Sequence, residues 1–292
     1  MNREKKICFI INPVAGGKRK GKFVEYLKNL NQEINSPQIF YSSYPGHSFE
    51  IAESELNKGA EIIVAVGGDG TINEIARALT GSDCSLGIIP FGSGNGFARH
   101  FKIPLDYKKA LGLIYSGKEI LIDTARVNEK EFFCTSGIGF DAEIGHLFAH
   151  FKHRGFISYG ISFLKAFKNY KSQNYKLIID ENTVLSDAFL VNIANISQFG
   201  SNFYIAPQAS ATDGFLNLVI LKKFPKWKVI PLIFRSYFRT IHKSSYIEEK
   251  NIKKLTIQSG SMKKKIHIDG EPETLKGDLR YTIVPESLKL IR

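Results

Sequence analysis

The sequence predicts a doubly wound α/β domain followed by a mainly antiparallel β domain, most simply a sandwich. In the first part, short apolar runs such as 62–66 and 86–89 end in glycine-rich turns and lead into segments with helical spacing. In the second part, runs typical of strands follow one another with few helical segments between them. A chain of 292 residues is long enough for two domains of ordinary size.

Composition narrows the class of protein. The longest purely apolar runs are short, such as 229–234, so none can span a bilayer. The apolar stretch 7–11 is too short for a signal peptide, which predicts a cytoplasmic protein. The cysteines Cys8, Cys84 and Cys134 lack metal-site spacing, and we expect them to be reduced thiols. A net charge of +12 favours nucleic acid, anionic membrane or phosphorylated ligands, without choosing among them.

The first strand is expected at 6–11 and leads into a glycine-rich loop at 12–18. Apolar residues at helical spacing follow from Phe23 onward. Residues 16–22 fit the spacing of a Walker loop, but Phe23 stands where that loop needs a hydroxyl for Mg²⁺. We therefore exclude a Walker loop here.

A second strand is expected at 38–44. On a purely structural interpretation the residues that follow form a turn, and Ser48 is the N-cap of the next helix.

The third strand ends abruptly in a turn with three glycines, Gly67, Gly68 and Gly70, around Asp69. A helical pattern begins immediately after Thr71. Glycines let backbone amides approach an anion, and a helix N-terminus adds positive potential. Asp69 and Thr71 can then hold Mg²⁺ or its waters beside bound phosphates.

A fourth strand, 86–90, leads into the loop 91–99, which contains Ser93 and Asn95. The glycine spacing in this loop is not that of a dinucleotide fingerprint. All of these loops follow the carboxyl ends of strands, which is the edge where open α/β sheets bind ligands. Their shared placement predicts a ligand site.

The string from Gly67 to Thr71, with Asn73 and Glu74, resembles the signature of the diacylglycerol kinase catalytic-domain family. That family includes bacterial lipid kinases and sphingosine kinases, and it shares the string with NAD kinases and, more distantly, with phosphofructokinases. The resemblance implies a first domain of NAD kinase/phosphofructokinase type that binds ATP and Mg²⁺.

Further segments match the family in order. Residues 12–16 match its first glycine turn and residues 42–47 its second. Ser93 and Asn95 match a third motif, in which Gly96 replaces an aspartate, and this departure leaves the acceptor lipid open. The nucleotide-binding residues that the resemblance implies are Asn12, Pro13, Val14, Ala15, Gly16, Ser42, Gly67, Gly68, Asp69, Gly70, Thr71, Ile72, Asn73, Glu74 and Ser93.

The chain is expected to leave the first domain along a strand at 119–127, in which Asp123 matches a family aspartate near Mg²⁺ and the transferred phosphate. Six further strands are expected at 132–134, 175–180, 184–194, 215–221, 254–258 and 265–269. Residues 281–291 are expected to form two short strands around Pro285 and to return to the first domain. The predicted division is 1–124 with the tail 284–292 for the nucleotide domain, and 125–283 for the lipid-substrate domain.

Two segments of the second domain, 146–176 and 215–247, contain no acidic residue and interleave aromatic with basic side chains. This composition suits an anionic bilayer surface, and equally an amphipathic helix packed on the core with a solvated basic face. No nucleic-acid-binding motif is present. We expect peripheral association with the inner membrane face and no nucleic-acid partner; a homodimer stays open.

Two loops of the second domain complete the resemblance. The loop around Asp213 resembles one that holds a structural Mg²⁺ in bacterial members, which implies Ser210, Asp213 and Phe215 as ligands. The D-G-E segment ending in Glu271 resembles the one that carries the family's catalytic base. By itself, Asp-Gly is a hairpin turn and Glu271 a loop carboxylate.

The resemblance therefore implies an ATP- and Mg²⁺-dependent lipid kinase with a cleft between its two domains. Glu271 is the implied base, and Asp69 and Asp123 organise Mg²⁺. Diacylglycerol is the first acceptor expected; a sphingoid base or another lipid alcohol follows. An NAD kinase shares the glycine string but not the D-G-E segment. The alternative from another class is a non-catalytic sensor of nucleotide or anionic membrane.

Overall fold

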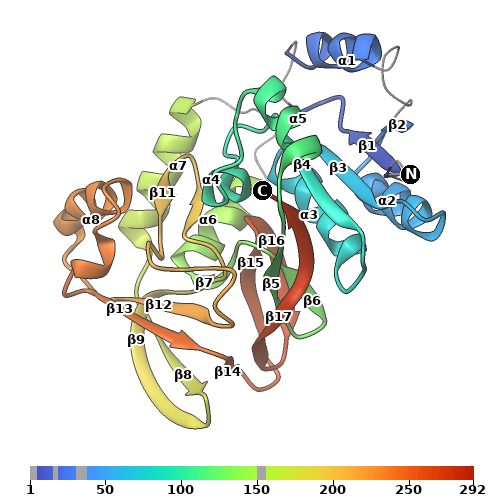
Figure 1. The fold of residues 1–292 in the computed structure, drawn as a ribbon. Coiled ribbons are helices and arrows are strands. Elements are labelled where there is room, and N and C mark those ends of the chain that lie inside the picture. The colour runs from blue at the N-terminus through green and yellow to red at the C-terminus, as the bar shows by residue number, and fades with distance from the viewer. Residues whose placement is uncertain (1–4, 16–18, 31–37, 150–155) are drawn as a thin grey trace. The chain divides into compact units, whose positions relative to one another are not determined.

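A computed structural model describes residues 5–15, 19–30, 38–149 and 156–292 (Figure 1). The chain forms two compact units. Unit 1 comprises residues 1–124 and 285–292, and unit 2 comprises residues 125–284. The chain passes from unit 1 to unit 2 within β5 (Glu119–Val127) and returns within β17 (Leu279–Ile291).

Unit 1 is built on a parallel sheet with the strand order β2-β1-β3-β4-β17. Its strands are β1 (Ile7–Ile11), β2 (Gln38–Tyr41), β3 (Ile62–Gly67), β4 (Ser85–Pro90) and the last residues of β17. Its helices are α1 (Arg19–Leu30), α2 (His47–Asn57), α3 (Asp69–Leu79), α4 (Gly96–His100) and α5 (Tyr107–Ser116).

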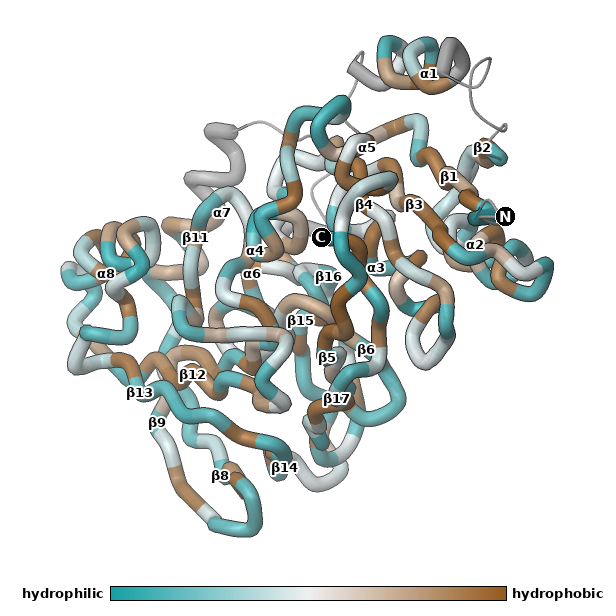
Figure 2. The backbone as a smooth tube through the Cα atoms, in the orientation of Figure 1, coloured by the Kyte–Doolittle hydropathy of each residue, from teal (hydrophilic) through white to brown (hydrophobic). Residues whose placement is uncertain are grey.

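Helices cover both faces of this sheet. Every residue of β3 and β4 is buried, and Figure 2 colours β1 and β3 as hydrophobic. The α1 side chain Phe23 packs against Tyr107 at the start of α5, whereas α2 packs against α3. Two covered faces require strands that are apolar throughout, as the sequence has here. The expected doubly wound α/β domain is confirmed.

Unit 2 is mainly antiparallel. Its sheet runs β16-β15-β7-β9-β8-β14-β17, with β12 between β9 and β13, and β6 paired with β5. The strands are β6 (Lys130–Phe132), β7 (Thr135–Gly139), β8 (Gln173–Ile179), β9 (Asn182–Ala194), β10 (Gln198–Gly200), β11 (Phe203–Tyr204), β12 (Leu216–Lys222), β13 (Ile247–Ile252), β14 (Lys254–Gln258), β15 (Lys263–Ile268) and β16 (Glu271–Lys276). The helices are α6 (Phe140–Ala149), α7 (Phe156–Asn169), α8 (Val229–Tyr237) and two short 3₁₀ turns at Lys226–Lys228 and Ile241–Lys243.

Two hydrophobic cores lie on opposite faces of β9 and β12. On β12, Leu218 and Ile220 face the first core, which is formed by side chains of the strands of unit 2. Val219 and Leu221 face a second core that α6, α7 and α8 complete. Because both faces are covered, the segment is apolar at successive positions instead of alternating with polar residues. The expected mainly antiparallel sandwich is confirmed, and helices pack on its outer face.

One expectation about the tail is wrong. Residues 279–291 form a single strand, β17, that passes through Pro285, not two short strands. Pro285 has no amide to donate, and the next amide, that of Glu286, donates to Asp123 Oδ1 at 2.9 Å instead of to the ladder. Glu286 adopts a φ of 48°, so the strand changes direction without ending. Across the described ranges, no helix is long and apolar enough to cross a membrane.

Candidate functional site

Two glycine loops of unit 1 touch at the carboxyl edge of its sheet. The loop after β3 begins at Gly68 and the loop after β4 contains Gly92. A Cβ on Gly92 would lie 2.6 Å from the Gly68 Cα, closer than van der Waals contact permits. The Phe91 amide donates to Gly67 O at 2.7 Å and fixes the same juncture. Glycine is therefore required here by backbone approach, whatever the loops bind.

Side chains tie these loops to one another and to the loop after β1. Asp69 Oδ1 accepts a hydrogen bond from the Phe97 amide at 3.2 Å. Asn12 Nδ2 donates to Thr71 Oγ1 at 3.2 Å. The other end of the Asn12 amide, Oδ1, accepts from the Val14 amide at 3.0 Å and forms a tight turn. Three segments that are distant in sequence thus form one surface.

Glu74 holds the loop after β2 in place. Its two carboxylate oxygens accept hydrogen bonds from the amides of Gly46 and Ser48, at 2.8 and 3.1 Å. The helix α2 begins after Gly46, so Ser48 lies inside its first turn and is not the N-cap that the sequence suggests. A carboxylate from α3 replaces the local cap, and it also complements the positive end of α2.

The remaining residues that the sequence assigns to the nucleotide differ in exposure. Gly70 and Ser93 are exposed, as is Val14, whose side chain is 87% accessible. Ser42 is buried, and so is Ile72, whose amide donates to Gly68 O within the helix. Pro13 is exposed, Ala15 and Asn73 are half-buried, and Gly16 lies outside the described residues.

Asp123 lies in the part of β5 that belongs to unit 1. It is 1% exposed, and its Oδ1 accepts the Glu286 amide already described. No group of three or more His, Cys, Asp or Glu side chains with metal-site geometry occurs in the part of the chain that the structure describes. Binding of Mg²⁺ by Asp69 and Asp123 stays a prediction.

In unit 2, the D-G-E segment is a two-residue hairpin turn between β15 and β16. Asp269 and Gly270 have φ of 49° and 88°, the left-handed pair that a tight hairpin needs. Glu271 is the first residue of β16 and pairs with Ile268. Its side chain is exposed, and no described residue forms an ion pair or side-chain hydrogen bond with it. The turn thus presents a free carboxylate at a fixed position.

A cavity of about 400 Å³ lies next to this turn in unit 2. Its volume falls within the range of roughly 300–1,000 Å³ that is typical of small-molecule sites. Gly270, the residue before Glu271, lines it, as does His267. The rest of the wall is aromatic and aliphatic, contributed by α6, α7, α8 and the adjoining strands, with Phe140, Phe167, Phe189, Leu221 and Leu232 among its members.

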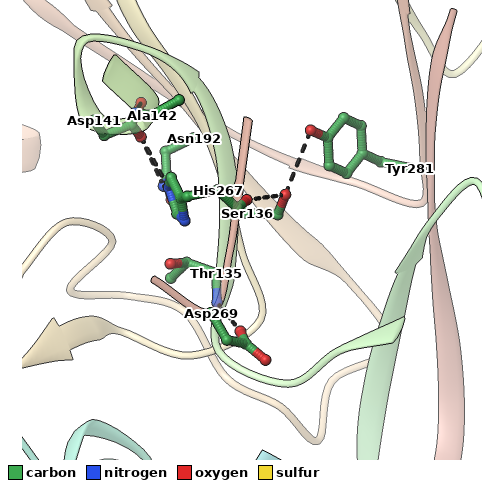
Figure 3. A network of polar contacts seen from close by, with 8 residues as sticks. All are labelled: Thr135, Ser136, Asp141, Ala142, Asn192, His267, Asp269 and Tyr281. Carbon is green, nitrogen blue, oxygen red and sulfur yellow. Dashed lines mark hydrogen bonds and ion pairs between the residues drawn. The ribbon is translucent and has the colours of Figure 1, made fainter. Parts of the chain in front are cut away.

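Asp141 and His267 belong to the lining of this cavity, and Figure 3 draws them with their neighbour Asn192. His267 Nε2 lies 3.1 Å from Asp141 Oδ2, and Asn192 Nδ2 lies 3.3 Å from the same oxygen. A Cβ on Gly137 would lie within 3.0 Å of all three side chains, so glycine makes room for the cluster. His267 Nδ1 and Asn192 Oδ1 are buried without a partner among the described residues. A buried unpaired polar atom is costly unless a ligand or water satisfies it.

Sequence reasoning missed the cluster of Asp141, Asn192 and His267. These residues come from α6, β9 and β15, so no local motif unites them. Residues so far apart in the sequence leave no signal that a reading of single segments could find.

The loop proposed for a structural metal is an Asp-Gly turn. Asp213 Oδ1 accepts the Phe215 amide at 3.0 Å, and Ser210 Oγ lies 3.1 Å from Thr212 Oγ1. Asp213 is exposed and is the one carboxylate that the implied set contributes. Magnesium binding by Ser210, Asp213 and Phe215 stays a prediction.

Comparisons with known proteins agree with this architecture. Residues 6–127 match the family model described as diacylglycerol kinase catalytic domain. Residues 135–292 match the model described as YegS C-terminal NAD kinase beta sandwich-like domain. A protein of Klebsiella pneumoniae named "Probable lipid kinase YegS-like" is 30% identical over 249 residues, covering 84% of this chain and 82% of that protein. A diacylglycerol kinase of Mycobacterium tuberculosis is 28% identical over 199 residues, covering 65% and 63%.

Solved structures share the fold. A crystal structure of a diacylglycerol kinase from Bacillus anthracis superposes with a TM-score of 0.78 at 20% identity, covering 100% of this chain and 98% of that one. A yeast NADH kinase complexed with NADH superposes with a TM-score of 0.55 at 12% identity, covering 99% and 84%. At these identities the likeness concerns the fold alone.

Proposed function

Because the chain belongs to the lipid kinase family that joins a diacylglycerol kinase catalytic domain to a YegS-type sandwich domain, we propose that it phosphorylates diacylglycerol with ATP. The product is phosphatidate. In this proposal, unit 1 binds the nucleotide and unit 2 binds the acceptor lipid.

The observation that carries the proposal is the apolar cavity beside the D-G-E turn. A lipid alcohol has a long hydrocarbon body and a small polar end. The cavity suits such a molecule, since its lining is almost wholly aromatic and aliphatic, with few polar side chains, namely Asp141, His267 and Ser236. A dinucleotide such as NAD would need polar partners for its riboses and phosphates, which this wall does not offer. The cavity therefore favours a lipid over NAD as the acceptor.

Glu271 is the proposed general base. The acceptor hydroxyl oxygen attacks the γ-phosphorus of ATP, the bond from that phosphorus to the β,γ-bridging oxygen breaks, and ADP leaves. The hydroxyl proton passes to the Glu271 carboxylate. An exposed carboxylate without an ion pair among the described residues remains able to accept that proton. The turn that carries it is held in place because Asp269 Oδ1 accepts the Thr135 amide at 2.9 Å.

On the nucleotide side, the contacting glycine loops and the N-terminus of α3 form a surface suited to phosphates. Asp69 and Asp123 are the carboxylates that would hold Mg²⁺, whose chemistry is to neutralise charge on the transferred phosphoryl group. Asp69 fits this role because it is the first residue of α3 and is only partly buried. Asp123 fits it less well, since it is 1% exposed and its Oδ1 already accepts the Glu286 amide.

A sphingoid base is the second candidate, and one observation favours it. Asp141 places a carboxylate of about 11% exposure in the lining of the cavity. An ammonium group beside the acceptor hydroxyl would pair with that charge, whereas diacylglycerol offers only ester oxygens there. Asn192 Nδ2 already donates to Asp141 Oδ2, and His267 Nε2 lies 3.1 Å from the same oxygen. These contacts reduce the need of Asp141 for a cation and keep diacylglycerol first.

The test is phosphate transfer from γ-labelled ATP with Mg²⁺ to a panel of diacylglycerol, sphingosine, phosphatidylglycerol and NAD. Phosphatidate as the main product supports the proposal. Sphingosine phosphate as the main product selects the second candidate. Labelled NADP, or ATP binding without transfer to any acceptor, would overturn the lipid kinase assignment and in the latter case favour a non-catalytic sensor.

A further inference from the structure

The helix α8 and the turn before it expose an unusual number of large apolar side chains. Sixteen large hydrophobic residues are exposed in the described part of the chain, and five of them fall within residues 227–238. Trp227 is 68% exposed, Phe234 58% and Phe238 73%. The other two are Ile230 and Tyr237. Single exposed hydrophobics need no explanation, but a cluster does.

These side chains form a stripe on one face of the helix. Ile230, Phe234, Tyr237 and Phe238 are spaced as residues of one helical face are. The other face of α8 also carries apolar residues, and Val229, Leu232 and Ile233 line the cavity of unit 2. A helix that only covers a core has a polar outer face. The amphipathic helix with a solvated basic face, which the sequence left equally open, does not describe α8.

The segment that carries the exposed stripe is rich in cations. Residues 215–247 contain no acid, and seven lysines and arginines occur between 222 and 243. These are Lys222, Lys223, Lys226, Lys228, Arg235, Arg239 and Lys243. Lys222 pairs with Glu248 at 3.0 Å, and none of the other six forms an ion pair with a described residue. Lys228 Nζ lies 4.1 Å from the centre of the Trp227 ring, so the charge accompanies the aromatic surface.

We propose that this surface docks on an anionic phospholipid bilayer, with Trp227, Ile230, Phe234 and Phe238 entering the headgroup region and the cations contacting lipid phosphates. We call these four side chains and the seven cations the α8 surface. Aromatic and aliphatic side chains flanked by lysine and arginine are the composition that binds such an interface. In Figure 1, α8 lies at an edge of unit 2, and the four apolar side chains of the α8 surface are exposed.

A second copy of the chain fits this surface less well. A two-fold symmetric contact through α8 would set the same unpaired cations of both copies against each other. Like charges at an interface oppose association, whereas an anionic bilayer attracts all of them. The charge of the α8 surface therefore favours an anionic bilayer over a second copy of the chain.

The proposal rests on the lipid acceptor proposed above and adds the place where that lipid is met. One face of α8 lines the acceptor cavity and the opposite face would contact the bilayer. Docking would thus place the acceptor cavity next to the bilayer that contains its lipid substrate.

The experiment measures binding and catalysis separately. Sucrose-loaded vesicles of phosphatidylcholine with phosphatidylglycerol, and of phosphatidylcholine alone, are sedimented with the wild type and with the double variant F234S/F238S. A matched control is L185S, which removes a side chain that is 77% exposed on β9 of the same unit. Both altered phenylalanines are exposed and neither lines the cavity, so folding and the site should be preserved.

We expect the wild type and L185S to sediment with phosphatidylglycerol vesicles, and the double variant to lose at least about tenfold in partition. Higher salt should weaken wild-type binding, as screening of charges requires. With dioctanoylglycerol supplied as monomers, the double variant should keep the wild-type rate. If the double variant bound phosphatidylglycerol vesicles as strongly as the wild type does, the proposal would be overturned. The proposal would also be overturned if sedimentation velocity showed that the wild type is a dimer and that the double variant is a monomer.

Failure of the proposed function gives a different pattern. In that case no lipid is phosphorylated, whether as vesicle or monomer, while the partition of the three proteins still reports on the α8 surface.

Discussion

Asp269 and Thr135 hold each other by two hydrogen bonds in opposite directions. The Asp269 amide donates to Thr135 O at 2.8 Å, and the Thr135 amide donates to Asp269 Oδ1 at 2.9 Å. The same carboxylate accepts the amides of Phe133 and Cys134, at 2.9 and 2.7 Å. Asp269 is therefore the residue that fixes the turn before Glu271 to the start of β7.

Asp269→Asn should disturb this clamp. An amide side chain keeps one acceptor oxygen, so at least one of the three backbone amides loses its partner. Hydrogen bonds to a charged group contribute about 1.5–3 kcal/mol each. We expect the free energy of unfolding to fall by about 2–3 kcal/mol in urea titrations, and kcat to fall while the Kd for ATP is unchanged. A variant with the stability and kcat of the wild type would contradict the clamp.

Glu271→Gln should remove the base and leave the fold intact. The side chain is exposed and its exchange is isosteric, so Tm should not move. General-base catalysis typically contributes about 10²–10⁴-fold, and kcat should fall by that factor with unchanged ATP binding by calorimetry. Glu181→Gln, an exposed glutamate of the same unit, is the matched control. Undiminished turnover in E271Q would exclude Glu271 as the base.

Gly92→Ala should separate the two glycine loops of unit 1. The added Cβ would lie 2.6 Å from Gly68 Cα and 2.7 Å from Asn95 Oδ1, so backbone has to move. Overpacking costs about 1–3 kcal/mol, and ATP affinity should fall at least about tenfold. Gly112→Ala is the control, because nothing lies within 4 Å of a Cβ there and α5 favours alanine. Equal ATP affinity in both variants would show that the contact is not needed for the nucleotide.

His100 should make unit 1 sensitive to acid. Burial, assisted by Arg292, lowers the pKa of His100 from 6.5 to about 4. The unfolded chain therefore takes up this proton first, so stability is full above pH 6.5 and falls as the pH drops from about 6.5 to about 4. The loss at the lower end is about 3 kcal/mol.

His100→Gln removes that proton uptake. Urea unfolding at pH 7, 5.5 and 4.5 should give a shallower decline for the variant than for the wild type. Parallel declines would show that His100 does not contribute to the acid sensitivity.

Local sequence patterns predict much of the fold. The bounds that the sequence predicts for the strands 119–127 and 254–258 are those of the structure, because residues that favour strands fill most of both segments. The Asp269–Gly270 hairpin is equally local, since only a few residue pairs tolerate two successive left-handed conformations. The continuous strand through Pro285 was not predictable from the sequence. The Glu286 amide leaves the strand ladder there and donates to the carboxylate of Asp123, which is distant in the sequence.

The sequence by itself determined the architecture, the glycine loops at the sheet edge and Glu271 in its turn, because backbone conformation and periodicity depend on neighbours in the chain. Only the tertiary structure decided that Asp141, Asn192 and His267 meet, with Asp141 and His267 in the lining of an apolar cavity. It also decided that α8 packs one apolar face on that cavity and exposes apolar residues on the other. Contacts between residues from α6, β9 and β15 depend on how sheets and helices pack. Periodicity along one segment reports which residues share a face, and packing decides what that face touches.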